Sequence, residues 1–222
     1  MVNKPESEGQ AETTREAKEA IHLTPARLET LTDGIFAIAM TILILNITVP
    51  HLPPEEFTES QLFHELYSQG HALINYAVSF TLLGVFWLIH HQQFHFIVRT
   101  NIWHIWMNLI GLLLVGLVPF TTSLIGEHRT SFGAVALFEA NMLLIGLVFY
   151  AQWAYATGGR RLTSPDLSQK EVLVGKRMNL ILPATSCAAA GLAILNPYSH
   201  QLGYLSIPVI FGLFHRRLLI FH

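Results

Sequence analysis

The chain has 222 residues, of which 51% are apolar and only 13% are charged. Soluble domains carry about 25% charged residues, so this composition favours a membrane protein before any segment is located. The formal net charge of −2 gives no reason to expect a nucleic-acid partner, and the single cysteine cannot form an intramolecular disulfide. We expect residues 1–24 to form a solvated tail, since they lack the apolar core of a signal peptide, and residues 25–222 to form one membrane domain.

Six apolar segments are candidates for crossing a membrane, which takes about 20 residues per helix. They cover residues 25–48, 58–96, 102–125, 131–155, 172–195 and, in a shorter stretch, 204–219. The second is too long to lie wholly in the bilayer, so we expect its amphipathic start, with a capping pattern at Thr58 and Gln61, at or above the surface. Pro119, Pro183 and Pro208 are expected to kink their helices. The sequence therefore predicts an all-α membrane protein with six transmembrane helices.

The distribution of basic residues predicts the orientation of these spans. With the N-terminus inside, all 13 lysines and arginines except Arg129 fall on the inner side. The outer loop at residues 51–59 contains glutamates and no lysine or arginine. We therefore expect both termini in the cytoplasm.

Several motifs that would indicate other functions are absent from the sequence. It contains no P-loop, dinucleotide-binding fingerprint or HExxH zinc helix, and no TVGYG potassium filter. We therefore expect neither an enzyme nor a bound cofactor. Any ion selectivity must come from something other than a ring of filter-loop carbonyls.

The first span begins with charged residues, and its aspartate leads directly into hydrocarbon. Such an aspartate is costly without a partner or water, so Asp33 is expected to have one. A helix rises about 1.5 Å per residue, which places several polar groups of the second and third spans near the depth of Asp33. These groups are Trp87, His90, His91 and Asn108. We interpret them as a polar network that fixes the first span, capped by Arg27; the alternative is that each belongs to the interfacial belt.

One face of the first span is almost entirely apolar. At helical spacing this face carries Gly34, Ile38, Thr41, Ile42, Leu45 and Thr48. A carrier site would need several polar groups, whereas the only hydroxyl between Ile38 and Leu45 belongs to Thr41. A single copy of such a face is ordinary helix packing. Several copies around the axis of a closed oligomer would form a hydrophobic constriction that gates by dewetting, with a ring of threonines. Both interpretations remain open at this point.

Two further groups of ionisable residues are candidates for a functional role. Glu139 lies about nine residues into the fourth span. It is interpreted either as an ion or proton site or as a hydrogen-bonded carboxyl close to Asn141. Together with the cytoplasmic-side histidines it supports an alternative function, a proton-coupled carrier or proton-permeable channel. His91 and His95 are one helical turn apart, but no third ligand is spaced to complete a metal site, so we expect no metal.

The stretch RLETLTDGIFAIAMTILILNI at residues 27–47 resembles the transmembrane protein 175 family, lysosomal and prokaryotic potassium channels that lack the usual filter. The family motif is Arg, three residues, then Phe-Ser-Asp. Arg27 and Asp33 match it, while Leu31 and Thr32 replace Phe and Ser. The stretches WLIHH and NLIGLLLVGLVPFTTSL are also similar to the family.

This resemblance implies a homotetramer of six-span subunits in the cell membrane, with the first span lining a central pore. It assigns the bottleneck to Ile38, further apolar pore positions to Ile42 and Leu45, and potassium selectivity to Thr41. It also implies a structural network of Arg27, Thr32, Asp33, Asn108 and one histidine of the second span. Glu139 matches no family position. We therefore expect a potassium-permeable channel, with other monovalent cations and protons as further candidate ions.

Overall fold

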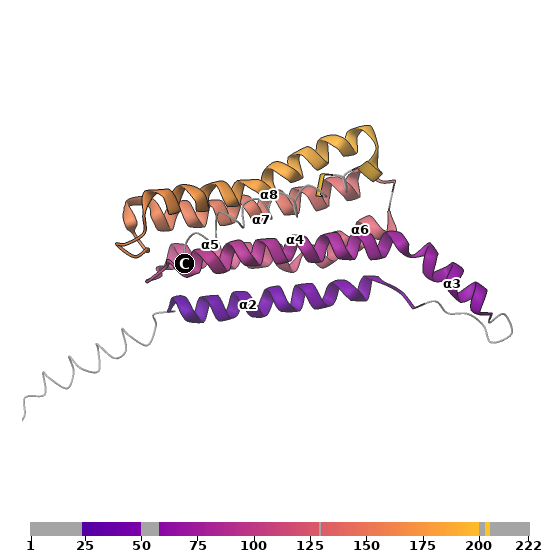
Figure 1. The fold of residues 1–222 in the computed structure, drawn as a ribbon, viewed down its shortest axis with the longest axis horizontal. Helices are drawn as coiled ribbons and strands as arrows, with labels where there is room; N and C mark the ends of the chain where they lie inside the picture. Colours follow the sequence, from indigo (N-terminus) through magenta and orange to yellow (C-terminus); the bar gives the residue numbers. More distant parts are fainter. Residues whose placement is uncertain (1–23, 50–57, 129, 200–202, 205–222) are drawn as a thin grey trace, which may run out of the picture.

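The structure is a computed structural model that describes residues 24–49, 58–128, 130–199 and 203–204. Nearly all of the described chain is helical, and the longest helices run side by side (Figure 1). The elements are α2 (Pro25–Ile42), η1 (Leu43–Asn46), α3 (Glu59–Ser68), α4 (Gly70–Phe94), α5 (Ile102–Gly116), α6 (Val118–Glu127), α7 (Phe132–Thr157), η2 (Gly158–Arg160), α8 (Gln169–Leu195) and η3 (Pro197–Ser199). The all-helical class predicted from the sequence is confirmed.

Within the described residues, five helical stretches are long and apolar enough to cross a membrane. They are Pro25–Asn46, Gly70–Phe94, Ile102–Glu127, Phe132–Arg160 and Gln169–Leu195. These correspond to the first five predicted spans. The predicted sixth span, 204–219, lies outside the described residues except for its first residue, and residues 1–23 of the predicted tail lie outside them as well.

Polar capping residues mark where α2, α5, α7 and α8 begin. The side chains of Thr24, Asn101, Ser131 and Ser168 each accept a hydrogen bond from a backbone N–H of the first helical turn. Such caps satisfy amide groups that have no partner within the helix. At α8 the cap is reciprocal, because the Glu171 side chain also accepts from the Ser168 backbone N–H.

The prediction of one continuous helix from Thr58 to Phe96 was wrong. The segment folds as two helices, α3 and α4, which meet at Gln69 with φ −85° and ψ 4°. Glycine has low helix propensity, and Gly70 follows the break directly. α3 buries none of its residues, whereas α4 contributes many side chains to the core.

Two prolines have different effects on their helices. The third predicted span is divided at Leu117 into α5 and α6, and Pro119, which lacks an N–H, lies in the first turn of α6. The predicted interruption is therefore present. Pro183, in contrast, lies inside α8, which continues through it.

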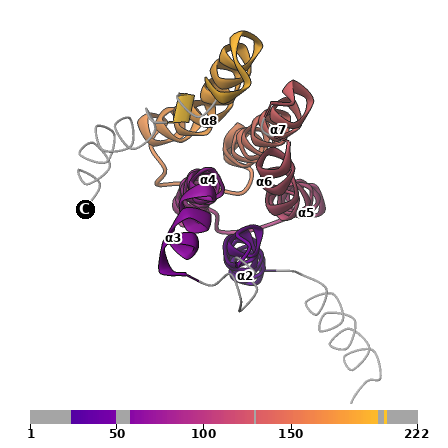
Figure 2. The ribbon, with the colours of Figure 1, turned by 90° about the vertical axis from the view of Figure 1, so that its right-hand side faces the viewer.

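The helices pack as a bundle in which α2 and α8 lie at opposite edges (Figure 2). α2 packs against α4, α5 and α6, and α7 packs along α8. Two glycines allow the close approach of α7 and α8, since a Cβ on Gly146 would overlap the Pro183 ring and one on Gly175 would overlap the Trp153 indole. α2 is therefore an edge helix, in contact with the rest of the described chain on one side.

Candidate functional site

α2 has one buried face and one exposed face. The buried side chains of α2 and η1 are Leu28, Thr32, Phe36, Ala39 and Leu43. On the other face, the exposed fractions of Ile38, Ile42 and Leu45 are 56%, 42% and 74%. Within the described chain, the whole apolar stripe predicted from the sequence is therefore uncovered. Apolar side chains left open on a membrane helix contact either lipid or another protein surface.

Thr41 lies on the same exposed face, between Ile38 and Leu45. Its hydroxyl donates to the Ile38 carbonyl at 2.9 Å, a bond within its own helix. Because the proton is used inside the helix, the oxygen lone pairs remain available to a group outside it. The stripe thus offers the hydroxyl oxygen of Thr41 among isoleucine and leucine side chains.

A buried polar network holds the opposite face of α2. Its centre is Asn108 of α5, whose Nδ2 donates to Thr32 Oγ1 at 3.0 Å. Asn108 Oδ1 accepts from Gln152 Nε2 of α7 at 3.1 Å and lies 2.9 Å from His90 Nε2 of α4. Because an amide oxygen only accepts, His90 Nε2 is the donor in this arrangement. All four side chains are at most 1% exposed, so four helices are tied together inside the bundle.

A second set of contacts joins α2 to α4 closer to the surface. Trp87 Nε1 donates to Asp33 Oδ1 at 2.8 Å, and His91 Nδ1 lies 3.1 Å from Glu29 Oε1. The Trp87 and His91 rings stack with their centroids 5.4 Å apart. Asp33 therefore has a partner at its own depth.

The structure brings most of the predicted network residues together, in two groups. His90 belongs to the buried group with Thr32 and Asn108, whereas His91 lies beside Asp33 and Trp87. Arg27 lies apart from both groups. Its side chain is exposed and makes no hydrogen bond or ion pair with any described residue. The described residues therefore give no contact for its predicted capping role.

Sequence reasoning did not single out three residues that hold α2. Gln152 completes the buried group, Glu29 pairs with His91, and Asn46 Nδ2 donates to the Pro119 carbonyl at 3.2 Å. Gln152 was detectable, because it is a polar residue in an apolar span at about the depth of Asn108. Since Asn46 of η1 fixes the far end, α2 and η1 are anchored at both ends, and Ile38, Ile42 and Leu45 lie between the anchors.

Glu139 is buried in a separate place, on α7. It accepts a hydrogen bond from the Tyr204 hydroxyl, which also lies 3.3 Å from Ser186 Oγ of α8. Nearby on α7, Asn141 Nδ2 donates to the Leu114 carbonyl at 3.2 Å. In the described ranges no hydrogen bond or ion pair joins Glu139 to a histidine. The carboxyl therefore links α7 to residue 204 and lies apart from the α2 anchors.

Comparison with known proteins gives consistent matches. The family model for the endosomal/lysosomal potassium channel TMEM175 matches residues 27–119, which include the exposed stripe and most of its anchors. A potassium channel of Streptomyces collinus is 35% identical over 143 residues, 63% of this chain and 68% of the relative. A potassium channel of Chamaesiphon minutus is 33% identical over 149 residues, 66% of this chain and 72% of the relative.

The fold is also similar to a solved structure. The crystal structure of a lysosomal potassium-selective channel TMEM175 homolog from Chamaesiphon minutus superposes with a TM-score of 0.72 at 26% identity. The match covers 85% of this chain and 96% of that one. The relatives are ion channels rather than enzymes. This chain belongs to the TMEM175 family of multi-pass membrane channels.

Proposed function

We propose that four copies of this chain form a potassium-permeable cation channel, with α2 of each copy lining a central axis. The observation that carries this proposal is the exposed apolar stripe on α2, whose opposite face is fixed by buried hydrogen bonds. Ile38, Ile42 and Leu45 are exposed in the single chain. Thr32, on the opposite face, is fully buried and accepts a hydrogen bond from Asn108. A closed symmetric oligomer is the economical way to bring four such faces together. The names of the bacterial relatives, potassium channels, support the same activity.

In this proposal the apolar side chains of the stripe form the gate. Ile38 is the bottleneck, and Ile42 and Leu45 extend the narrow apolar section. Such a section opposes conduction by excluding water, and ions pass when it is wetted. Thr41 adds a ring of hydroxyl oxygens next to the bottleneck, where they replace part of the hydration shell of the ion and favour potassium.

The polar anchors set the orientation of α2 around the axis. Thr32, His90 and Asn108 fix its rotation from inside the subunit, while Asp33 and Trp87 fix the entrance end. A helix anchored on one face presents its other face in a fixed orientation. A gate made of one side chain from each of four copies requires such a fixed orientation. Arg27, exposed in the single subunit, would find its partner in a neighbouring copy.

We further propose six spans per subunit, the last at 204–219, with residues 1–24 as a cytoplasmic tail and both termini in the cytoplasm. The distribution of lysine and arginine supports this orientation. The bacterial relatives favour the cell membrane as the location.

The test is ion flux into liposomes that contain the purified full-length chain. A channel dissipates a potassium gradient when no pH gradient is present, whereas a proton-coupled carrier needs one. Glu139→Gln distinguishes them further, since it should leave potassium flux of a channel intact. The subunit number, measured by mass in a gentle detergent, should be four. A stable monomer, or the absence of cation flux at every pH, would refute the proposal.

A further inference from the structure

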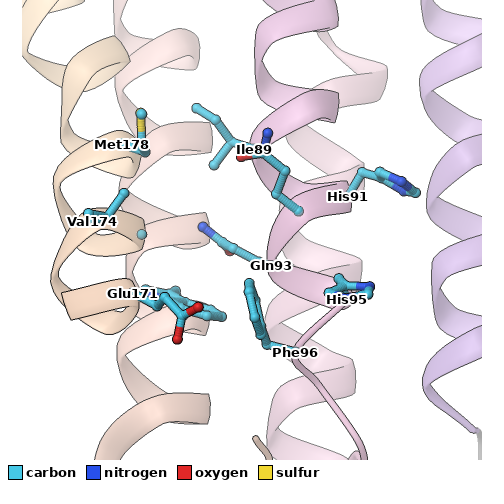
Figure 3. Close-up of a pocket in the computed structure, with 11 residues that line it drawn as sticks. Ile89, His91, Gln93, His95, Phe96, Glu171, Val174 and Met178 are labelled. Carbon is cyan, nitrogen blue, oxygen red and sulfur yellow. The ribbon is translucent and has the colours of Figure 1, made fainter. Parts of the chain in front are cut away.

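A cleft of about 460 Å³ opens between α4 and α8 at the end of the bundle where α2 begins (Figure 3). Its walls are the last turns of α4, the first turns of α8 and Trp153 of α7. His91, near the rim, points toward α2 and its partner Glu29, whereas Gln93 points toward α8 (Figure 3). The cleft thus lies on the opposite side of α4 from the proposed pore.

The cleft changes in polarity along its length. Ile89 and Met178 line the part that lies deeper in the bundle. Phe96 and the carboxylate of Glu171 line the part nearest the helix ends (Figure 3). Because both helices are membrane spans, this gradient runs from the membrane interface into hydrocarbon. An amphiphile with its polar end at the interface matches it.

Gln93 provides a hydrogen-bond donor without a partner. The residue is only 5% exposed, and its Nε2 has no hydrogen-bond partner among the described residues. The amide extends from α4 toward α8 across the cleft (Figure 3). Leaving a buried N–H unpaired is costly, so this position favours a ligand that brings an acceptor oxygen.

Glu171 provides a negatively charged hydrogen-bond acceptor at the rim of the cleft. Its Oε2 accepts from the Ser168 backbone N–H at 2.7 Å as part of the helix cap. No described residue forms a salt bridge with it. The other oxygen and the negative charge therefore remain available to a cationic donor, and they disfavour an anionic group in the same place.

We propose that this cleft binds a glycerophospholipid whose head group ends in a primary ammonium. The ammonium donates to Glu171, an ester or phosphate oxygen accepts from Gln93 Nε2, and the acyl chains leave past Ile89 and Met178. A choline head group cannot satisfy Glu171 in this way, because its quaternary nitrogen has no N–H. A glycerol head group carries no positive charge. The proposal depends on the membrane setting of the fold and not on ion selectivity.

The test is native mass spectrometry of the full-length protein with equal amounts of phosphatidylethanolamine and phosphatidylcholine. We expect phosphatidylethanolamine to be retained about tenfold more, the ratio that one charge-assisted hydrogen bond supports. Stepwise N-methylation of the lipid amine should lower retention progressively in the unaltered protein. Glu171→Gln should bring the ratio close to one, since glutamine preserves the helix cap but not the charge. Gln93→Leu should weaken retention of both lipids to a similar extent.

Glu127→Gln is the matched control, because it removes the same charge from an exposed residue at the end of α6. It should leave the lipid ratio unchanged. Equal retention of the two lipids by the unaltered protein, or stronger retention of phosphatidylglycerol, would overturn the proposal. The same holds if Glu127→Gln lowers the ratio as much as Glu171→Gln does. The methylation series needs no variant, so a folding defect in Glu171→Gln does not remove the test.

Discussion

Replacing Asn108 with leucine tests whether the buried network holds α2 in place. Leucine has nearly the same shape, so the change removes hydrogen bonds without opening a large cavity. The side chain of Asn108 makes three such bonds, to Thr32, His90 and Gln152. A hydrogen bond between membrane helices contributes about 0.6 kcal/mol on average, and a buried polar group left unpaired costs about 1–3 kcal/mol. We therefore expect the free energy of unfolding to fall by about 2–4 kcal/mol.

The loss is measured by titrating the purified protein from mild detergent into a denaturing one and following helix content. Asn141→Leu serves as the control, because Asn141 is also buried but its side chain makes one hydrogen bond, to the Leu114 carbonyl. Its Oδ1 has no partner among the described residues, so its removal offsets part of the loss. We expect this control to cost less than about 1 kcal/mol.

Equal losses for the two variants would refute the idea that Asn108 is the centre of a network. A double-mutant cycle adds a second check. Thr32→Val and Asn108→Leu remove the same hydrogen bond, so their combined cost should be smaller than the sum of the separate costs. Additive costs would show that the 3.0 Å contact between the two side chains contributes nothing measurable.

Three further substitutions test the pore face and its outer anchor. Ile38→Asn should raise single-channel conductance, because a polar side chain wets the constriction; unchanged current would place the gate elsewhere. Thr41→Ala should lower the ratio of potassium to sodium permeability, measured from reversal potentials, while Thr41→Ser should preserve it; equal ratios in all three proteins would exclude the hydroxyl from selectivity. Trp87→Phe keeps an aromatic ring, although a smaller one, but loses the indole N–H that reaches Asp33, so the free energy of unfolding should fall by about 1 kcal/mol. Trp103→Phe, on an exposed side chain, should leave it unchanged, and equal shifts would argue against a specific Trp87 anchor.

The polar anchors show which contacts can be predicted from the depth of a residue along its helix. The rise of a helix is a local property, so position in sequence places Asp33, Trp87 and Asn108 at similar depth without knowledge of the fold. Rotation about the helix axis is different, because it depends on which neighbours a helix meets. For this reason the sequence does not distinguish His90 from His91, whereas in the structure α4 directs His90 inward to Asn108 and His91 toward Glu29.

Gln152 shows a second limit of sequence reasoning. The depth of Gln152 in the membrane follows from its position in the fourth span. Its contact with Asn108, however, joins residues 44 positions apart and depends on how α5 and α7 pack. The break between α3 and α4 has a different, local origin, because it lies next to Gly70, a residue with low helix propensity. The sequence pattern predicted one amphipathic start followed by one span, and the turn at Gln69 separates the two helices.

By itself the sequence determined the membrane class, the positions of the first five spans and the apolar stripe of α2, because these depend on hydrophobicity and helical period along one segment. Only the tertiary structure decided which face of that helix is buried. A run of apolar residues is equally compatible with core and surface, and the difference is set by the side chains of α4 and α5 that pack against it. Once Thr32 is bonded to Asn108, the face with Ile38 and Leu45 must point away from the subunit.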